Sequence, residues 1–195
     1  MDPDLPLIEA IQAGDDSALS ELINRHREPL FHFVFRYLRD ETAAGDVVQE
    51  TFVRAYFKAA NFQPRATVKT WVYAIALNLC RDQARKLAKR RNDLPLDAPR
   101  TENSRPIELT DSQLQPSEQS GQRERFVILQ RAIDRLPESL REVLILFSLE
   151  GRSQKEVAEI LGTTPKTVEL RVYHAKKKLR EWLEAPLADA PSAKI

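Results

Sequence analysis

Residues Ser153–Trp182 read SQKEVAEILGTTPKTVELRVYHAKKKLREW, and this stretch predicts two short helices around a tight turn. Val157, Ala158 and Leu161 recur at helical spacing and form an apolar face on the first helix. Gly162 follows them and favours a left-handed exit from the helix, because glycine has no side chain to clash there. The small Ala158 lets the two helices approach closely.

The second helix of this stretch has its own start signal. The Thr164 hydroxyl can cap it, and Pro165 suits the first helical position. Apolar residues then return every three or four positions, at Val168, Val172, Ala175, Leu179 and Trp182. The pattern is typical of a helix-turn-helix, in which the first helix crosses the DNA backbone and the second enters the major groove.

The outward face of the second helix is basic. It carries Lys166, Arg171, Lys176, Lys177, Lys178 and Arg180, against Glu169. A face of this kind suits contact with phosphates, and the turn, the cap and the charge agree with one another. An ordinary helical hairpin with a solvated basic face is the alternative.

Composition excludes several classes of protein. The chain has 195 residues, five glycines, one cysteine and a net charge of +1, so DNA contact must come from local patches. One cysteine allows neither an internal disulfide nor a cysteine-based zinc site, which fits a cytoplasmic protein. The chain lacks a secretory signal, a long apolar run, a clustered metal-ligand set and a glycine-rich phosphate loop, so we expect neither an enzyme nor a cofactor.

Apolar periodicity predicts an all-α protein with two small helical domains. The first domain spans 1–91 and the second spans 123–184. Residues 92–122 hold four prolines, many polar residues and no helical stripe, which predicts a flexible linker, and 185–195 form a tail. The expected helices are 5–13, 16–38, 44–60, 68–91, 123–136 and 140–149, followed by the helix-turn-helix, with a loop at 61–67.

Two parts of the chain resemble one protein family. DVVQETFVRAY (Asp46–Tyr56) and NFQPRATVKTWVYAIALNLCRDQARK (Asn61–Lys86) are similar to region 2 of bacterial sigma-70-type factors, most closely to the extracytoplasmic-function (group IV) class. Residues Ala132–Glu181 are similar to region 4 of the same class. The resemblance implies a transcription initiation factor that binds core RNA polymerase, directs it to −35 and −10 promoter elements, and performs no covalent chemistry.

The resemblance implies that the helix Asp46–Tyr56 binds core RNA polymerase. In the family this helix docks on the clamp helices of the polymerase's largest catalytic subunit. Its exposed polar face is made by Asp46, Gln49, Glu50 and Arg54, which follow three- and four-residue steps. Without the resemblance, a solvated helix face would explain the same residues. Val48 and Phe52 are expected in the core.

The loop at 61–67 and the helix after it resemble the part of the family that reads the −10 element. Promoter opening takes a base out of the stack, and a pocket must compensate for the lost stacking. Trp71 and Tyr73 are candidate stacking platforms, although Trp71 could equally anchor the core. The set implied for −10 DNA is Asn61, Phe62, Gln63, Arg65, Lys69, Trp71, Tyr73, Asn78, Arg81 and Arg85.

The helix-turn-helix corresponds to the −35 reader. The set implied for −35 DNA is Thr164, Lys166, Thr167, Glu169, Leu170, Arg171, Tyr173, His174 and Lys177. Glu169 can accept from cytosine N4, and Leu170 can touch a thymine methyl group. Both depart from the commonest family pattern, which is more basic and smaller there, so we expect a −35 element different from that of the stress-envelope subclass.

The sequence is also compatible with functions other than that of a sigma factor. An autonomous helix-turn-helix regulator would bind duplex DNA alone, as a dimer, without the first domain. A nucleic-acid hydrolase is disfavoured, since no nucleophile–base pattern is visible. Family members are often held inactive by an anti-sigma factor, and a flexible linker would permit both a compact, occluded arrangement and an extended one on polymerase.

Overall fold

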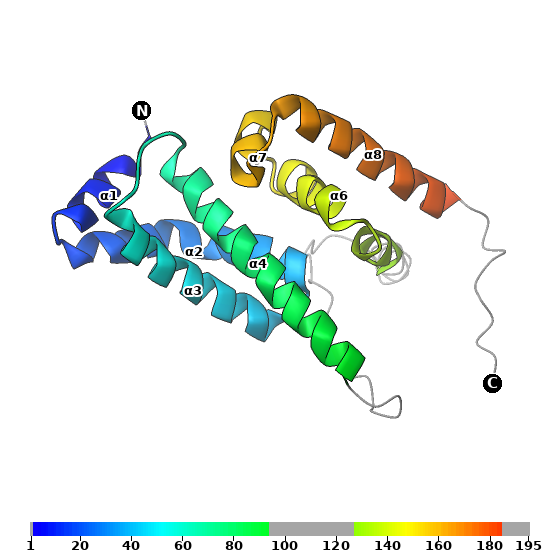
Figure 1. The fold of residues 1–195 in the computed structure, drawn as a ribbon, viewed down its shortest axis with the longest axis horizontal. Helices are drawn as coiled ribbons and strands as arrows, with labels where there is room; N and C mark the ends of the chain where they lie inside the picture. Colours follow the sequence, from blue (N-terminus) through cyan, green and yellow to red (C-terminus); the bar gives the residue numbers. More distant parts are fainter. Residues whose placement is uncertain (1, 94–126, 185–195) are drawn as a thin grey trace, which may run out of the picture.

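The computed structural model describes residues 2–93 and 127–184, and every regular element in these two ranges is helical (Figure 1). The all-α prediction is therefore confirmed. The first bundle consists of α1 (Leu5–Gln12), α2 (Asp16–Leu38), α3 (Glu41–Ala59) and α4 (Val68–Asp93). The second consists of a helical segment at 127–134, α6 (Glu138–Val143), the π-helix η1 (Leu144–Leu149), α7 (Gln154–Leu161) and α8 (Pro165–Glu184). The predicted linker, from residue 94 onward, and the predicted tail lie outside the described residues.

Helix starts follow local side-chain chemistry. The Asp15 carboxylate accepts from the Ser17 N–H at 2.9 Å and caps α2. The Asp40 carboxylate accepts from the Ala43 N–H at 2.8 Å, so α3 begins three residues earlier than the apolar pattern indicated. An acidic residue at this position satisfies amides that otherwise have no partner within the helix.

Helix α2 is the centre of the first bundle. Its buried side chains cover more than one face, as its crowded apolar sequence predicted. They include Leu22, Leu30, Phe33, Val34 and Tyr37. Helices α1, α3 and α4 each pack against α2, so this core fixes the position of the loop between α3 and α4.

The segment expected as one α-helix over 140–149 is helical but changes type. Helix α6 widens at Leu144 into η1. The Glu150 N–H donates to the carbonyl of Ile145 at 2.9 Å, and the Arg152 N–H donates to the carbonyl of Leu146 at 3.1 Å. A π-helix is rare and often marks a functional position.

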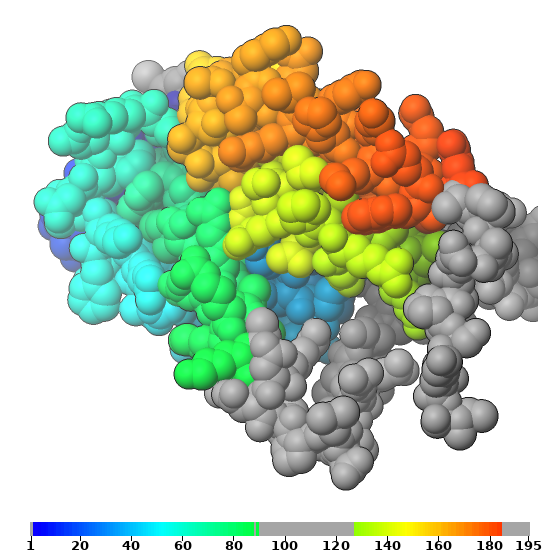
Figure 2. Space-filling model, turned by 45° about the vertical axis from the view of Figure 1, so that its right-hand side comes forward, coloured from blue at the N-terminus to red at the C-terminus, as the bar shows by residue number. Residues whose placement is uncertain are grey.

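The two bundles pack against each other. One cluster of buried apolar side chains runs from the first bundle into Val143, Leu146, Val157 and Val168 of the second. A smaller cluster, which includes Leu136 and Leu179, belongs to the second bundle alone. Figure 2 shows the yellow-green segment that holds α6 directly against the green α4. None of the described helices has the length and apolar content that crossing a bilayer requires.

Candidate functional site

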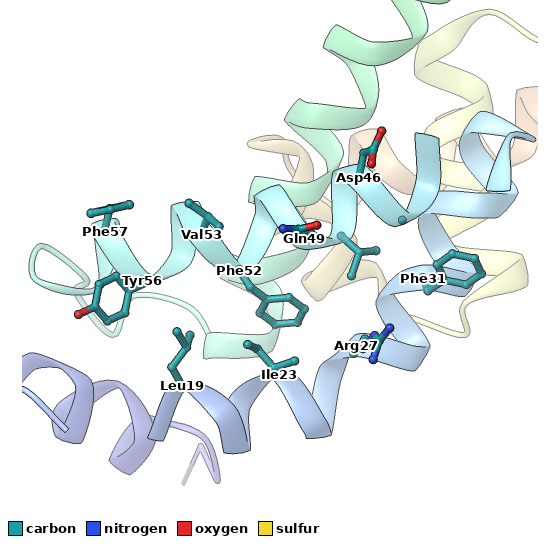
Figure 3. Close-up of a pocket in the computed structure, with 12 residues that line it drawn as sticks. Leu19, Ile23, Arg27, Phe31, Asp46, Gln49, Phe52, Val53, Tyr56 and Phe57 are labelled. Atoms are coloured by element: carbon teal, nitrogen blue, oxygen red, sulfur yellow. The ribbon is translucent and has the colours of Figure 1, made fainter. Parts of the chain in front are cut away.

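A groove of about 690 Å³ lies between α2 and α3 (Figure 3). Leu19 and Ile23 of α2 face Phe52 of α3 across it. Phe57 stands at one end with 73% of its surface exposed. Tyr56 is 36% exposed, and its hydroxyl donates to a carboxylate oxygen of Asp16 at the start of α2.

The predicted docking residues divide between two neighbouring faces of α3. Asp46 and Gln49 line the groove. Glu50 and Arg54 lie beside it and form an ion pair at 2.7 Å. Val48 and Phe52 are each 5% exposed, which confirms their expected place in the core.

The groove combines an apolar floor with a polar rim. Val53, Tyr56 and Phe57 are large apolar or aromatic side chains left exposed along one helix. Val53 and Phe57 were not among the predicted site residues, although apolar residues beside the polar face of a helix are a usable signal. The shape suits an amphipathic helix of a partner protein, since such helices insert apolar residues into a groove of this type.

The loop at 61–67 presents its polar side chains to solvent. Asn61, Gln63 and Arg65 are exposed, and Lys69 is exposed just after the loop. The rings of Phe62 and Trp71 lie 4.8 Å apart between centroids at an angle of 57°. Both rings are half-buried and pack on the core, so Trp71 braces the loop and remains partly exposed.

The N-terminus of the chain also holds this loop in place. The Asp2 carboxylate accepts from the Val68 N–H, the first amide of α4, at 2.6 Å. The Thr67 hydroxyl accepts from the Thr70 N–H at 3.2 Å. The contribution of Asp2 was missed because it joins residues 66 positions apart, and no local pattern announces such a contact.

Tyr73 does not have the accessibility that its predicted role requires. Its ring is fully buried, 5.2 Å from the Phe33 ring and 3.9 Å from the Arg152 guanidinium. Burial raises the pKa of its hydroxyl. In this arrangement of the bundles no base can stack on Tyr73, so its predicted stacking role is wrong here. Helical spacing does not show whether a second domain covers a given helix face, so the sequence could not reveal that Arg152 covers Tyr73.

The basic residues of α4 differ in accessibility. Asn78 is exposed, and its side-chain oxygen accepts from Arg81 at 3.2 Å. Arg85 has 71% of its side chain exposed and lies 3.8 Å from Asp82. Arg81 has only 28% exposed, because its guanidinium donates to Glu142 of the second bundle.

The predicted −35 residues lie on an accessible face of α8. Leu170 is 54% exposed and Tyr173 is 62% exposed. His174 lies edge-on to Tyr173, with ring centroids 5.5 Å apart, and Arg171 is half-buried. Four of the other predicted residues are exposed: Thr164, Lys166, Glu169 and Lys177. Thr167 is half-buried.

Within that face, the charged residues pair with their helix neighbours. Lys166 binds Glu169 at 2.9 Å, and Lys177 lies 3.9 Å from Glu181. The Thr164 hydroxyl accepts from the Thr167 N–H at 3.2 Å, as its predicted capping role requires. Both ion pairs are exposed to solvent, so each contributes little to the stability of the helix.

The inner faces of the helix-turn-helix need two corrections. Ile160, rather than Leu161, is the third buried residue of α7, while Leu161 is half-buried. The last member of the predicted α8 stripe, Trp182, is 38% exposed and lies 5.8 Å from the Lys178 amine. It sits near the helix end, where little of the second bundle remains to cover it.

A capping box begins α7. The Ser153 hydroxyl accepts from the Glu156 N–H at 3.2 Å, and Glu156 accepts from the Ser153 N–H at 2.9 Å. The hydrogen bonds from Ser153 lower the pKa of Glu156. This contribution to stability is therefore present at neutral pH and is lost as the pH falls through the lowered pKa.

We expect Ser153→Ala to destabilise the second bundle by about 1 kcal/mol, because the Glu156 N–H loses its acceptor and the Glu156 carboxylate loses the hydroxyl that donates to it. Thermal unfolding followed by circular dichroism measures the change. Ser148→Ala, at an exposed serine of η1, is the matched control, and an equal loss in both variants would contradict the role of the cap.

In the ranges 2–93 and 127–184 no group of His, Cys, Asp and Glu side chains is placed to hold a metal ion. Cys80 is fully buried among the apolar side chains of α4, and burial raises the pKa of its thiol.

Comparison with known proteins places this geometry in a family. The family model for sigma-70 region 2 matches residues 22–91, and that for sigma-70 region 4 matches residues 126–179. The ECF RNA polymerase sigma-E factor of Salmonella typhimurium is 30% identical over 176 residues, which cover 90% of this chain and 92% of that protein. The chain belongs to the ECF sigma factors. The RNA polymerase sigma-H factor of Pseudomonas aeruginosa is 28% identical to this sigma factor over 190 residues, 96% of this chain and 97% of that protein.

Two solved structures share the fold of this sigma factor. CnrH, in complex with the cytosolic domain of CnrY, is 27% identical with a TM-score of 0.68, covering 93% of this chain and 97% of CnrH. The sigma factor RpoE of Bartonella quintana, in complex with the anti-sigma factor NepR, is 23% identical with a TM-score of 0.61, covering 85% of this chain and 96% of that one. The accessible face of α8 lies within the region 4 match, and the groove lies within or beside the region 2 match.

Proposed function

We propose that this ECF sigma factor binds core RNA polymerase through the groove between α2 and α3 and reads promoter DNA with α4 and α8. In this assignment residues 1–91 bind the polymerase and open the −10 element, 92–122 are the linker, 123–184 read the −35 element, and 185–195 are a tail. The factor acts in the cytoplasm with the polymerase, and we assign it no covalent chemistry or cofactor.

The observation that carries the polymerase assignment is the row of exposed apolar side chains on α3. Phe57 is 73% exposed and lies outside the core of its own bundle. An exposed aromatic side chain of this kind is typical of a surface that a partner protein covers. Asp46, Gln49, Glu50 and Arg54 surround that row and supply the polar rim that keeps the free surface soluble.

The −10 assignment rests on the exposed loop and on its rigid support. Asn61, Gln63 and Arg65 offer hydrogen-bond donors and acceptors toward solvent, and Lys69 adds a cation. The paired rings of Phe62 and Trp71 stiffen the base of the loop. A pocket for an extruded base needs this combination of polar contacts and a fixed wall. We no longer include Tyr73 as an accessible stacking platform, given its burial.

The −35 assignment rests on the face of α8. Glu169, Leu170, Tyr173 and His174 lie exposed on it, where a recognition helix meets base edges. Thr164, Lys166, Thr167, Arg171 and Lys177 lie around them and are placed to contact the DNA backbone.

We expect Arg171→Ala to weaken binding to a −35 duplex and to reduce the slope of log K against log salt by about one contact, because one phosphate contact is lost. Binding is measured at several salt concentrations by fluorescence anisotropy. Arg135→Ala, at an exposed arginine outside α8, is the control. An unchanged slope in Arg171→Ala would remove this residue from the interface.

We further propose that an anti-sigma factor controls this protein by covering the groove. The support is the open apolar groove of this chain and the likeness to CnrH, whose structure contains the cytosolic domain of CnrY. Affinity capture of the tagged chain from its source cell should recover a small protein that core polymerase displaces. Capture of polymerase subunits alone would contradict the control proposal.

Transcription in vitro tests the proposed function. Core polymerase supplied with this chain should produce run-off transcripts of defined length from genomic fragments, and neither component alone should do so. If the chain binds duplex DNA as a dimer and leaves the products of core polymerase unchanged, it is an autonomous regulator instead.

A further inference from the structure

The N-terminal segment, residues 2–12, precedes the part of the chain that the region 2 family model matches, which begins at residue 22. It is nevertheless an integral part of the first bundle. Ile8 is 1% exposed and Ile11 is 8% exposed, and both belong to the main apolar core. Helix α1 packs on α2 and on α3, so the polar side chains at the two ends of the segment have fixed positions.

Asp2 holds the end of the loop at 61–67 that leads into α4. One oxygen of its carboxylate accepts from the Val68 N–H at 2.6 Å, and the other accepts from the Asp4 N–H at 3.1 Å. A carboxylate at this position satisfies an amide that has no partner within the helix and lies at the positive end of the helix dipole. The first residues of the chain therefore lie beside the start of α4 (Figure 1).

Gln12, the last residue of α1, holds the other end of the same loop. Its side-chain amide donates to the carbonyl of Ala59, the last residue of α3, at 2.8 Å. The same carbonyl accepts from the Phe62 N–H at 3.0 Å, in the first turn of the loop. One short segment thus contacts the point where the chain leaves α3 and the point where it enters α4.

Asp4 fixes this segment to α2. Its carboxylate accepts from Arg25 at 3.1 Å and lies 2.7 Å from Nε2 of His26. Asp4 is 5% exposed and His26 is 6% exposed. Moving the segment away from α2 would leave a buried carboxylate without its partners, which is costly. The segment is therefore a rigid support, and the loop is held at both ends against a fixed reference.

We propose that residues 2–12 form a two-point clamp, in which Asp2 and Gln12 are positioning residues for recognition of the −10 element. The loop between them exposes Asn61, Gln63 and Arg65 to solvent. A loop whose ends are fixed loses less conformational freedom when it binds, so more of its contact energy becomes affinity. The DNA part of this inference rests on the proposed function, whereas the clamp itself does not.

Two single variants open the clamp at one end each. Asp2→Ala removes the acceptor of the Val68 N–H. Gln12→Met keeps the length of the side chain and removes the amide that donates to Ala59, without adding a charge. Glu9→Ala is the matched control, because it removes one exposed carboxylate from the same segment. Circular dichroism verifies that all variants are folded.

The DNA measurement uses the full-length chain assembled with core polymerase. The probe is a fluorescent single-stranded oligonucleotide that carries the −10 element of a promoter located by run-off transcription. Asp2→Ala and Gln12→Met should each bind this probe about fivefold more weakly, as is typical when one hydrogen bond is lost. Their affinities for core polymerase and for a −35 duplex should equal those of the parent, and Glu9→Ala should match the parent throughout.

Asp2→Asn separates positioning from charge. Asparagine keeps an oxygen for the Val68 N–H and removes the negative charge, so its affinity for the probe should fall between those of the parent and Asp2→Ala. If charge alone mattered, both variants would bind the probe more tightly than the parent, because a negative group beside DNA would be gone. Tighter binding by both, or equal binding by Asp2→Ala and the parent, would overturn the positioning role.

Hydrogen exchange in the free chain tests the clamp without polymerase or DNA. The amides of Phe62 and Val68 should exchange faster in Asp2→Ala and Gln12→Met than in the parent and in Glu9→Ala. Unchanged exchange at both amides would overturn the clamp. A parent chain that fails to bind the probe when assembled with core polymerase would contradict the proposed function, and faster exchange in the two variants would then still support the clamp.

Discussion

We expect Phe57→Ala to lower the affinity of this sigma factor for core RNA polymerase about 30-fold. A large aromatic side chain that fills a partner's surface contributes about 2 kcal/mol or more when it is a central contact, and 1.4 kcal/mol corresponds to a factor of ten. Phe57 is 73% exposed in the free chain, so its removal leaves the core of the first bundle intact. Binding to labelled core polymerase measures the effect directly.

Leu170→Ala is the matched control for this prediction. Leu170 is also an exposed apolar side chain, 54% exposed, but it lies on α8 in the proposed −35 face. It should retain core affinity and lose −35 duplex binding. If Phe57→Ala and the parent chain bind core polymerase equally well, the groove between α2 and α3 is not the docking surface.

The second large effect concerns stability. Phe33→Ala should destabilise the first bundle by about 3–5 kcal/mol, because deleting a fully buried ring removes its burial and leaves a cavity. Phe33 packs against the buried Tyr73 ring at 5.2 Å between centroids, so the cavity opens at the centre of the bundle.

Urea unfolding with tryptophan fluorescence resolves this effect. Trp71 lies in the first bundle and Trp182 in the second, so a Trp182→Phe background reports the first bundle alone. In that background, Phe57→Ala should change stability by no more than about 0.5 kcal/mol, as is usual for an exposed position. Equal midpoints for Phe33→Ala and Phe57→Ala would show that Phe33 is not in a tightly packed core.

Local chemistry in the sequence predicted the helices well. Thr164 caps α8 as expected, and Gly162 has a φ of 62° at the end of α7. These features depend on residues a few positions apart, so a linear reading contains the information needed. The buried residues Val168 and Val172 follow the same logic, because one helix face repeats every three or four residues.

Contacts between distant parts of the chain could not be predicted in this way. Tyr73 and Arg81 lie on helix positions that read as accessible, yet Arg152 and Glu142 of the second bundle cover them. Helical periodicity predicts which side of α4 packs on the first bundle. It does not predict that the second bundle, formed by later residues, also packs on α4. Asp2, which caps α4 from the N-terminus, was missed for the same reason.

The candidate sites were predictable in part. The family matches over residues 22–91 and 126–179 confirm the resemblance to sigma regions 2 and 4, and these ranges contain the expected docking helix, loop and recognition helix. It did not indicate the apolar row at Val53 and Phe57, because their exposure depends on how α3 packs on α2. The roles of individual residues in each site remain predictions.

The central claim is that one chain joins polymerase docking to strand opening, and permanganate reactivity of promoter thymines tests it most directly. On a promoter located by run-off transcription, core polymerase together with this chain should make thymines of the −10 element reactive, while either component alone should leave them protected. Thymines that stay protected with both components present, or that become reactive with core polymerase alone, would contradict the account.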